Sequence, residues 1–119
     1  MAAIIIEPQT YIISAGDVEV VSLDYTPHLA KTNANPPVLT ELLTGTPTVT
    51  TDGSATLANK AVNTATYVDK YSNETVAVGA AVQFSITSAV AGTETITITV
   101  STDASIARTF VRRIIITVQ

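Results

Sequence analysis

The segment Thr95-Ile96-Thr97-Ile98-Thr99-Val100 alternates threonine with an aliphatic residue at every step. Successive side chains of a β-strand point to opposite faces, so this alternation predicts a strand with one apolar face and one threonine face. Threonine, valine and isoleucine favour strands, and they contribute 21, 14 and 12 of the 119 residues. The whole chain is therefore expected to be all-β.

Further strands are predicted on both sides of this segment. A change of apolar phase at Val20-Val21 predicts a β-bulge in a strand over 18–25. Asp52-Gly53 is typical of a two-residue β-hairpin. The last strand is expected over 106–118. Seven or eight short strands, spaced by roughly ten residues, indicate an antiparallel β-sandwich, and a partly closed barrel is the alternative.

Residues 1–17 are expected to form an N-terminal arm or edge strand ahead of a sandwich domain at 18–119. Two apolar runs, Ile4-Ile5-Ile6 and Tyr11-Ile12-Ile13, flank Pro8, and proline is excluded from the middle of a central strand. This segment either adds as a strand to a neighbouring molecule or forms the first strand of its own sandwich.

Charge and composition argue against several classes of partner. The net charge is −4, and binding to nucleic acid is disfavoured because phosphates require a positive field. Cysteine is absent, so there is no disulfide framework and no thiolate chemistry. No stretch approaches the ~18 apolar residues of a membrane span, and the N-terminus lacks the basic start of a signal peptide. We therefore expect a protein made in a cytosol, with no membrane partner.

No catalytic, metal or cofactor motif is recognisable. The single histidine, His28, is expected in a solvated loop, and the sequence has no Gly-Xaa-Ser-Xaa-Gly turn. A zinc site requires several histidine or cysteine ligands, and Asp52 and Asp103 are isolated turn residues. The expectation is a protein that is not an enzyme and that holds no cofactor.

One possible ligand surface is aromatic. Tyr67, Asp69 and Tyr71 are expected on one face of a strand, where they would suit a sugar ring. Ordinary packing of half-buried tyrosines is the favoured explanation.

Two groups of residues are candidates for binding a protein partner. One is the apolar N-terminal segment, and the other is a set of arginines near the C-terminus. Arg108 and Arg112 share one face of the last predicted strand, so part of that face is expected to reach solvent or a partner. The arginines either bind an acidic surface or protect a sheet edge. The candidates are Ile4, Ile5, Ile6, Tyr11, Ile12, Ile13, Arg108, Arg112 and Arg113.

The segment between Glu74 and Asp103 contains a single charged residue, Glu94. Exposed sheets of free monomers normally carry charges that block pairing with other chains. Threonine and serine occupy the predicted outer positions here. This pattern favours a domain that is covered by neighbours in a multicopy assembly.

Three segments resemble the small phage fiber-tail adaptor proteins, over about residues 22–118: Ser22-Leu23-Asp24-Tyr25-Thr26, Ala91-Gly92-Thr93-Glu94-Thr95-Ile96-Thr97-Ile98-Thr99-Val100-Ser101-Thr102 and Arg108-Thr109-Phe110-Val111-Arg112-Arg113-Ile114-Ile115-Ile116-Thr117-Val118. The resemblance implies an Ig-like sandwich in a tailed-phage virion, joining tail, neck, fibre or capsid proteins and assembled in the host cytoplasm. Pro27-His28-Leu29 stands where that family tends to have tryptophan, and Ala107 stands where it usually has glycine. Capsid decoration, as a cement protein, is the alternative, and a carbohydrate-binding adhesive module is a third.

Overall fold

The computed structural model describes residues 4–30, 38–69 and 73–119, with side chains described from Thr10 onward within these ranges. Strands dominate the described chain, and the single helix, α1 (Thr26–Leu29), has four residues. The strands are β1 (Ile4–Ile13), β2 (Val18–Asp24), β3 (Leu43–Thr51), β4 (Thr56–Val62), β5 (Tyr67–Val68), β6 (Thr75–Val76), β7 (Ala81–Thr87), β8 (Gly92–Thr102) and β9 (Thr109–Val118).

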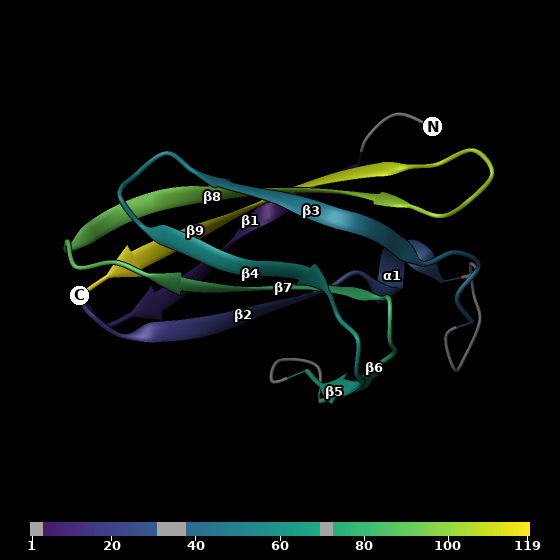
Figure 1. Cartoon of the computed structure of the whole chain (residues 1–119), viewed down its shortest axis with the longest axis horizontal. Helices are drawn as coiled ribbons and strands as arrows, with labels where there is room; N and C mark the ends of the chain where they lie inside the picture. Colours follow the sequence, from purple (N-terminus) through teal and green to yellow (C-terminus); the bar gives the residue numbers. More distant parts are fainter. Residues whose placement is uncertain (1–3, 31–37, 70–72) are drawn as a thin grey trace.

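Two sheets form the layers of a β-sandwich (Figure 1). One sheet has four strands in the order β1-β9-β8-β3, and the other has three in the order β2-β7-β4. The short strands β5 and β6 form a separate antiparallel pair. The prediction of an all-β antiparallel sandwich is confirmed, and the two main sheets together contain seven strands.

The core follows the period-two pattern of β8. Ile96, Ile98 and Val100 are buried, and the threonines between them lie on the outer face. Side chains from both sheets meet in a single apolar cluster, which includes Phe84 of β7 and Phe110 of β9. The described residues therefore share one contiguous hydrophobic core.

β1 is one edge strand of the four-stranded sheet. It pairs in parallel with β9, from Ile4 opposite Phe110 to Ile13 opposite Val118. The register shifts between Ile6 and Gln9, next to Pro8, because proline has no N–H to donate to the ladder. The two apolar runs thus belong to one strand, and this pair is an exception to the antiparallel pattern of the other pairs.

The expected bulge at Val20-Val21 is wrong. β2 pairs with β7 in unbroken register, from Val18 opposite Thr87 to Asp24 opposite Ala81. Val21 is buried, whereas the side chain of Val20 points outward and is 70% exposed. The apparent change of phase arises because valines occupy both faces of a regular strand.

The expected hairpin at Asp52-Gly53 is also wrong, because this turn carries the chain from one sheet to the other. β3 pairs with β8, and β4 pairs with β7. The turn is held by β8 instead: Asp52 Oδ1 accepts a hydrogen bond from the Thr95 N–H at 2.8 Å. Glu94 contributes two further bonds, since its Oε1 accepts from Thr51 Oγ1 at 2.5 Å and from the Ala55 N–H at 3.0 Å.

The last strand begins at Thr109 rather than at residue 106. Thr102 and Arg108 close the β8–β9 connection, with the Thr102 N–H donating to the Arg108 carbonyl at 3.0 Å and the Arg108 N–H donating to Thr102 Oγ1 at 3.0 Å. Ile106 therefore lies in the turn, where its side chain is 79% exposed.

Candidate interaction surfaces

The outer face of the four-stranded sheet is poor in charge. Thr48 and Thr50 of β3 lie opposite Thr99 and Thr97 of β8, so threonines of neighbouring strands form short rows across the sheet. On the β9 side, these rows continue to Val111 and Arg113. Arg113 is the single charged residue among the outward positions that the structure describes on this sheet.

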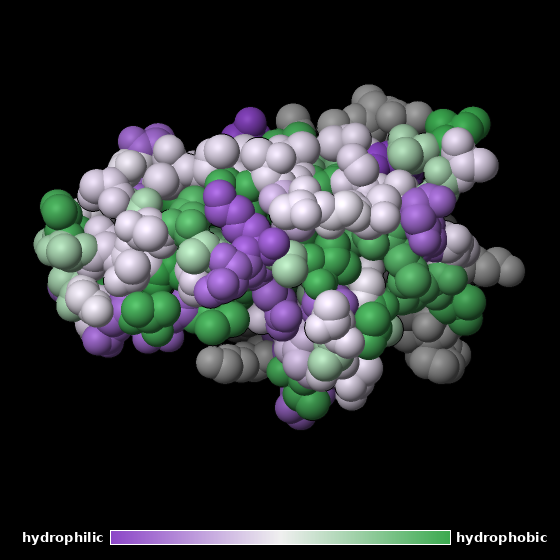
Figure 2. Space-filling view, in the orientation of Figure 1, coloured by the Kyte–Doolittle hydropathy of each residue, from purple (hydrophilic) through white to green (hydrophobic). Residues whose placement is uncertain are grey.

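The part of this outer face near β1 is more apolar. Ile115 of β9 is partly exposed, and Ile12 of β1 is 66% exposed. Figure 2 shows the pale, intermediate hydropathy that threonine and serine give to much of the visible surface. Together the threonine rows and these aliphatic side chains make a surface that suits contact with another protein.

Glu94 does not place a charge on this face. Its side chain is buried against the turn that follows β3, and residue 53 is a glycine because a Cβ there would lie 2.7 Å from Glu94 Cδ. The one acidic residue between Glu74 and Asp103 is thus an internal turn ligand, which leaves the exposed part of β8 without charge.

The three candidate arginines do not form one basic surface. Arg108 Nε forms an ion pair with Glu41 Oε1 at 2.7 Å, and its Nη2 donates to the His28 carbonyl. Its guanidinium also lies 5.1 Å from the ring centroid of Phe110. Arg113 lies on the opposite face of β9 and is exposed. Of the three, Arg113 is the one placed on the outer face of the sheet.

Arg112 is buried, so the expectation that it reaches solvent or a partner is wrong. Its side chain is 7% exposed, and Nη1 donates to the Asp24 carbonyl at 3.2 Å. The guanidinium lies 5.5 Å from the ring centroid of Tyr25, which lies inside the sandwich. Burial raises the pKa of Tyr25 to about 12, while the nearby Arg112 charge acts to lower it. Arg112 has an internal, structural role.

His28 is not a solvated loop residue. It belongs to α1, is partly buried, and its ring centroid lies 5.7 Å from that of Phe110. Burial lowers its pKa below the ordinary value of 6.5, and the charges of Arg112 and Arg108 lower it further, against the opposing effect of Asp24. Folding therefore favours the neutral form of His28.

The candidate partner-binding residues of the N-terminal segment all belong to β1 and have different environments. The backbone of Ile4, Ile5 and Ile6 pairs with residues 110–112, and their side chains lie outside the described part. Ile13 is a core residue at 6% exposure, whereas Ile12 faces outward. Tyr11 is partly buried and lines a cleft at the edge of the sandwich.

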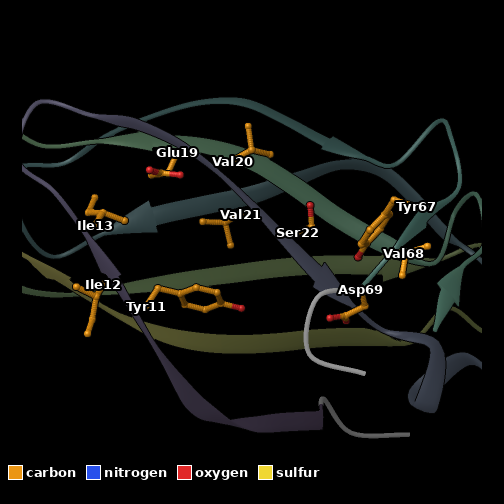
Figure 3. Close-up of a pocket in the computed structure, with 10 residues that line it drawn as sticks. All are labelled: Tyr11, Ile12, Ile13, Glu19, Val20, Val21, Ser22, Tyr67, Val68 and Asp69. Atoms are coloured by element: carbon orange, nitrogen blue, oxygen red, sulfur yellow. The ribbon is translucent and has the colours of Figure 1, made fainter. Parts of the chain in front are cut away.

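This cleft, of about 270 Å³, lies between β1, β2 and β5 (Figure 3). Its walls carry aromatic, aliphatic and acidic side chains: Tyr11, Ile12, Ile13, Glu19, Val20, Val21, Ser22, Tyr67, Val68 and Asp69. Tyr67 and Asp69, which were expected on one face of a strand, both line this cleft, although Asp69 follows the end of β5; Tyr71 lies outside the described residues. No local sequence pattern indicates the cleft, because its three strands are brought together by the topology of the fold.

The hydroxyl of Tyr67 is a buried polar group beside the cleft. This hydroxyl has no hydrogen-bond partner among the described residues. Burial, followed by the negative charges of Asp24 and Asp69, raises the pKa of Tyr67 to about 12. The phenol is therefore protonated at neutral pH and presents a polar oxygen beside acidic groups.

The described residues contain no group of three or more histidine, aspartate or glutamate side chains placed to hold a metal ion. Within the same residues, the helix is too short to cross a membrane.

No family model and no curated protein matches this chain. Two solved structures give weak structural matches. One is a nucleoside hydrolase-related hypothetical protein from Saccharophagus degradans associated with carbohydrate metabolism, at 20% identity over 94% of this chain, with a TM-score of 0.47. This chain spans 22% of that protein's length. The other is amebosin, at 17% identity over 92% of this chain and 88% of its own length, with a TM-score of 0.39. Both likenesses are too weak to indicate a function.

Proposed function

We propose that this chain is a non-enzymatic structural protein of a tailed-phage virion, which joins other virion proteins as a fibre adaptor of the tail or neck. The observation that carries the proposal is the outer face of the four-stranded sheet, where rows of threonine and a few aliphatic side chains surround Arg113, the one charge among the side chains that the structure describes there. A molecule that works alone in solution usually displays lysine or glutamate on such a face.

The size of this face suits one protein contact. Four strands spaced by about 4.8 Å, with nine to eleven residues each at about 3.3 Å per residue, span roughly 600 Å². A standard interface covers about 800 Å² on each partner, so this face and its rim are sufficient for one. In a symmetric particle, repeated copies of such a contact add their binding energies through avidity.

The resemblance of residues 22–118 to phage fiber-tail adaptor proteins supports a place in the tail or neck. The same surface also suits a cement protein that decorates the capsid. The position of the chain in the particle, at the tail or neck or on the head, distinguishes these two functions.

The test is to purify virions of the phage that encodes this chain, to identify the chain by mass spectrometry, and to locate it by cryo-electron microscopy. Density at the tail or neck, and particles without fibres when the gene is deleted, are the expected results. Density on the head instead identifies capsid decoration. Absence of the chain from purified particles overturns the proposal.

A further inference from the structure

Arg113 lies on an inner strand of the four-stranded sheet and points outward. β9 runs between β1 and β8, and Thr97 of β8 lies directly opposite Arg113. Along β9, Val111 and Ile115 are its neighbours on the same face, because side chains two positions apart in a strand point the same way. The side chains around Arg113 on β8 and β9 are therefore uncharged.

The charge of Arg113 is not balanced within the described part of the chain. Arg108 pairs with Glu41, and Arg112 donates to the Asp24 carbonyl. The exposed side chain of Arg113 makes no ion pair or hydrogen bond with any described residue. In the free chain its guanidinium is hydrated by water.

The contact proposed above for this face would remove that water. A charge that is taken out of water without a partner is strongly destabilising, and the threonine hydroxyls nearby are neutral. A guanidinium presents five donors in a planar fork, and a carboxylate accepts two of them in parallel. A protein that covers this face is therefore expected to bring a carboxylate to Arg113.

A second copy of this chain does not bring that carboxylate through the same face. Arg113 is the one charge among the outward side chains that the structure describes on this sheet, so two copies placed face to face would bring arginine against uncharged side chains. Each copy also has a net charge of −4, which makes copies repel one another. The charge pattern favours a different protein as the partner.

We propose that the outer face of the four-stranded sheet binds a surface of another virion protein that is poor in charge and carries one aspartate or glutamate, whose carboxylate pairs with Arg113. The inference rests on the proposed function, because it names the chemistry of the partner at that same face. Arg113 selects the partner and fixes its position on the sheet, while the threonine rows contribute most of the buried area.

The test adds the purified full chain back to particles from a phage that lacks the gene. Binding is measured as the amount of chain that sediments with the particles, over a range of chain concentrations. Arg113→Gln removes the charge, and we expect it to weaken binding about tenfold. Arg113→Lys keeps the charge and should bind more tightly than Arg113→Gln. Arg113→Glu brings two carboxylates together and should show no saturable binding.

Lys60→Glu is the matched control for Arg113→Glu. Lys60 belongs to β4 of the other sheet, and both substitutions change the net charge of the chain by the same amount. A general effect of charge on binding to the particles would appear in both variants. Lys60→Glu should therefore bind as tightly as the unchanged chain.

A further variant tests whether Arg113 is paired inside the chain. Glu7 lies where the register of β1 shifts, between the partners of Arg112 and Ile114. Denaturant unfolding of Glu7→Gln, Arg113→Gln and the double variant should give additive changes, because no ion pair joins the two positions. In a cryo-electron microscopy map of the virion, a carboxylate of the neighbouring protein should lie within hydrogen-bond distance of the Arg113 guanidinium.

Unchanged binding of Arg113→Gln, equal binding of Arg113→Lys and Arg113→Gln, or non-additive unfolding of the Glu7 and Arg113 variants overturns the inference. Sedimentation of the purified chain tests for a second copy: a dimer that dissociates when Thr99→Lys adds a charge to this face would also overturn it.

The inference and the proposed function fail in different ways. If Thr99→Lys abolishes binding to particles while the Arg113 variants bind normally, the acidic partner is rejected and the interface remains. If the unchanged chain is absent from virions and does not bind to particles, the proposed function is rejected.

Discussion

The guanidinium of Arg112 lies 5.5 Å from the ring centroid of Tyr25, inside the sandwich rather than on its surface. The contact joins β9 of one sheet to the residue that follows β2 of the other, and Arg112 Nη1 also donates to the Asp24 carbonyl at 3.2 Å. Arg112 therefore links the two layers at the end where α1 begins.

Replacing Arg112 should destabilise the chain. Arg112→Ala removes the bond to the Asp24 carbonyl and leaves space beside Tyr25, so we expect the free energy of unfolding to fall by about 2–4 kcal/mol. Arg113→Ala is the matched control, because Arg113 is exposed on the same strand, and its effect should stay within about 0.5 kcal/mol. Denaturant unfolding measures both. Equal stability of the two variants would contradict the buried position of Arg112.

Gly53 and Glu94 should show strong energetic coupling. A Cβ at position 53 would lie 2.7 Å from Glu94 Cδ, so Gly53→Ala forces the carboxylate away from Thr51 and Ala55. We expect Gly53→Ala and Glu94→Ala each to lower the free energy of unfolding by about 1–3 kcal/mol. In the double variant the clash with the carboxyl group is gone and the contact with the Cβ of residue 94, at 2.8 Å, remains, so its loss should be smaller than the sum of the single losses by about 1 kcal/mol. A strictly additive double-mutant cycle would show that the two positions do not contact each other.

The pH dependence of stability should report on His28. Its pKa in the folded chain is lowered from 6.5, chiefly by burial and then by the charges of Arg112 and Arg108. The unfolded chain therefore takes up a proton at a higher pH than the folded chain does. The free energy of unfolding should decrease as the pH falls through about 6.5, and this contribution should level off below the folded pKa.

His28→Gln should remove this part of the pH dependence, because glutamine does not titrate. Denaturant unfolding of both proteins between pH 5 and pH 8 provides the measurement. Identical profiles for the two proteins would mean that the pKa of His28 is not shifted by folding.

The sequence predicted those features that depend on local periodicity. The alternation of Ile96, Ile98 and Val100 with threonine placed β8, its core face and its outer face correctly. Pro8 correctly indicated that the N-terminal segment does not form a central strand, although β1 continues past it as an edge. In both cases the information lies in neighbouring residues of one strand.

Features that depend on contacts between distant segments were not predicted. Asp52-Gly53 has the sequence of a hairpin turn, but Thr95 and Glu94, more than forty positions away, hold it as a connection between sheets. Arg112 lies on the face that alternation assigned to it, yet periodicity does not reveal that the Asp24 carbonyl and the Tyr25 ring make burial possible. The cleft was missed for the same reason, since no local pattern links β1, β2 and β5.

A single charge on the outer face of the four-stranded sheet should abolish assembly without affecting the fold. Thr99 is the most useful position, because its direct neighbours across the strands, Thr48 and Val111, are uncharged. In the free chain, the lysine side chain of Thr99→Lys extends into water. In the assembled particle, its ammonium group would lie where a bound partner would have to remove the surrounding water. In the free chain we expect its effect on the free energy of unfolding to stay within about 0.5 kcal/mol.

The matched control for Thr99→Lys is Ala58→Lys, since Ala58 is exposed on β4 of the other sheet. Both variants add the same charge to a sheet surface, so a general effect of charge on solubility or expression would appear in both. Complementation of a phage that lacks the gene, followed by quantification of the chain in purified particles, compares them. If purified particles lack the Thr99→Lys variant and contain the Ala58→Lys variant, the interface lies on the threonine rows. Normal incorporation of Thr99→Lys would show that this face is open to water in the particle, and the argument from its missing charges would fail.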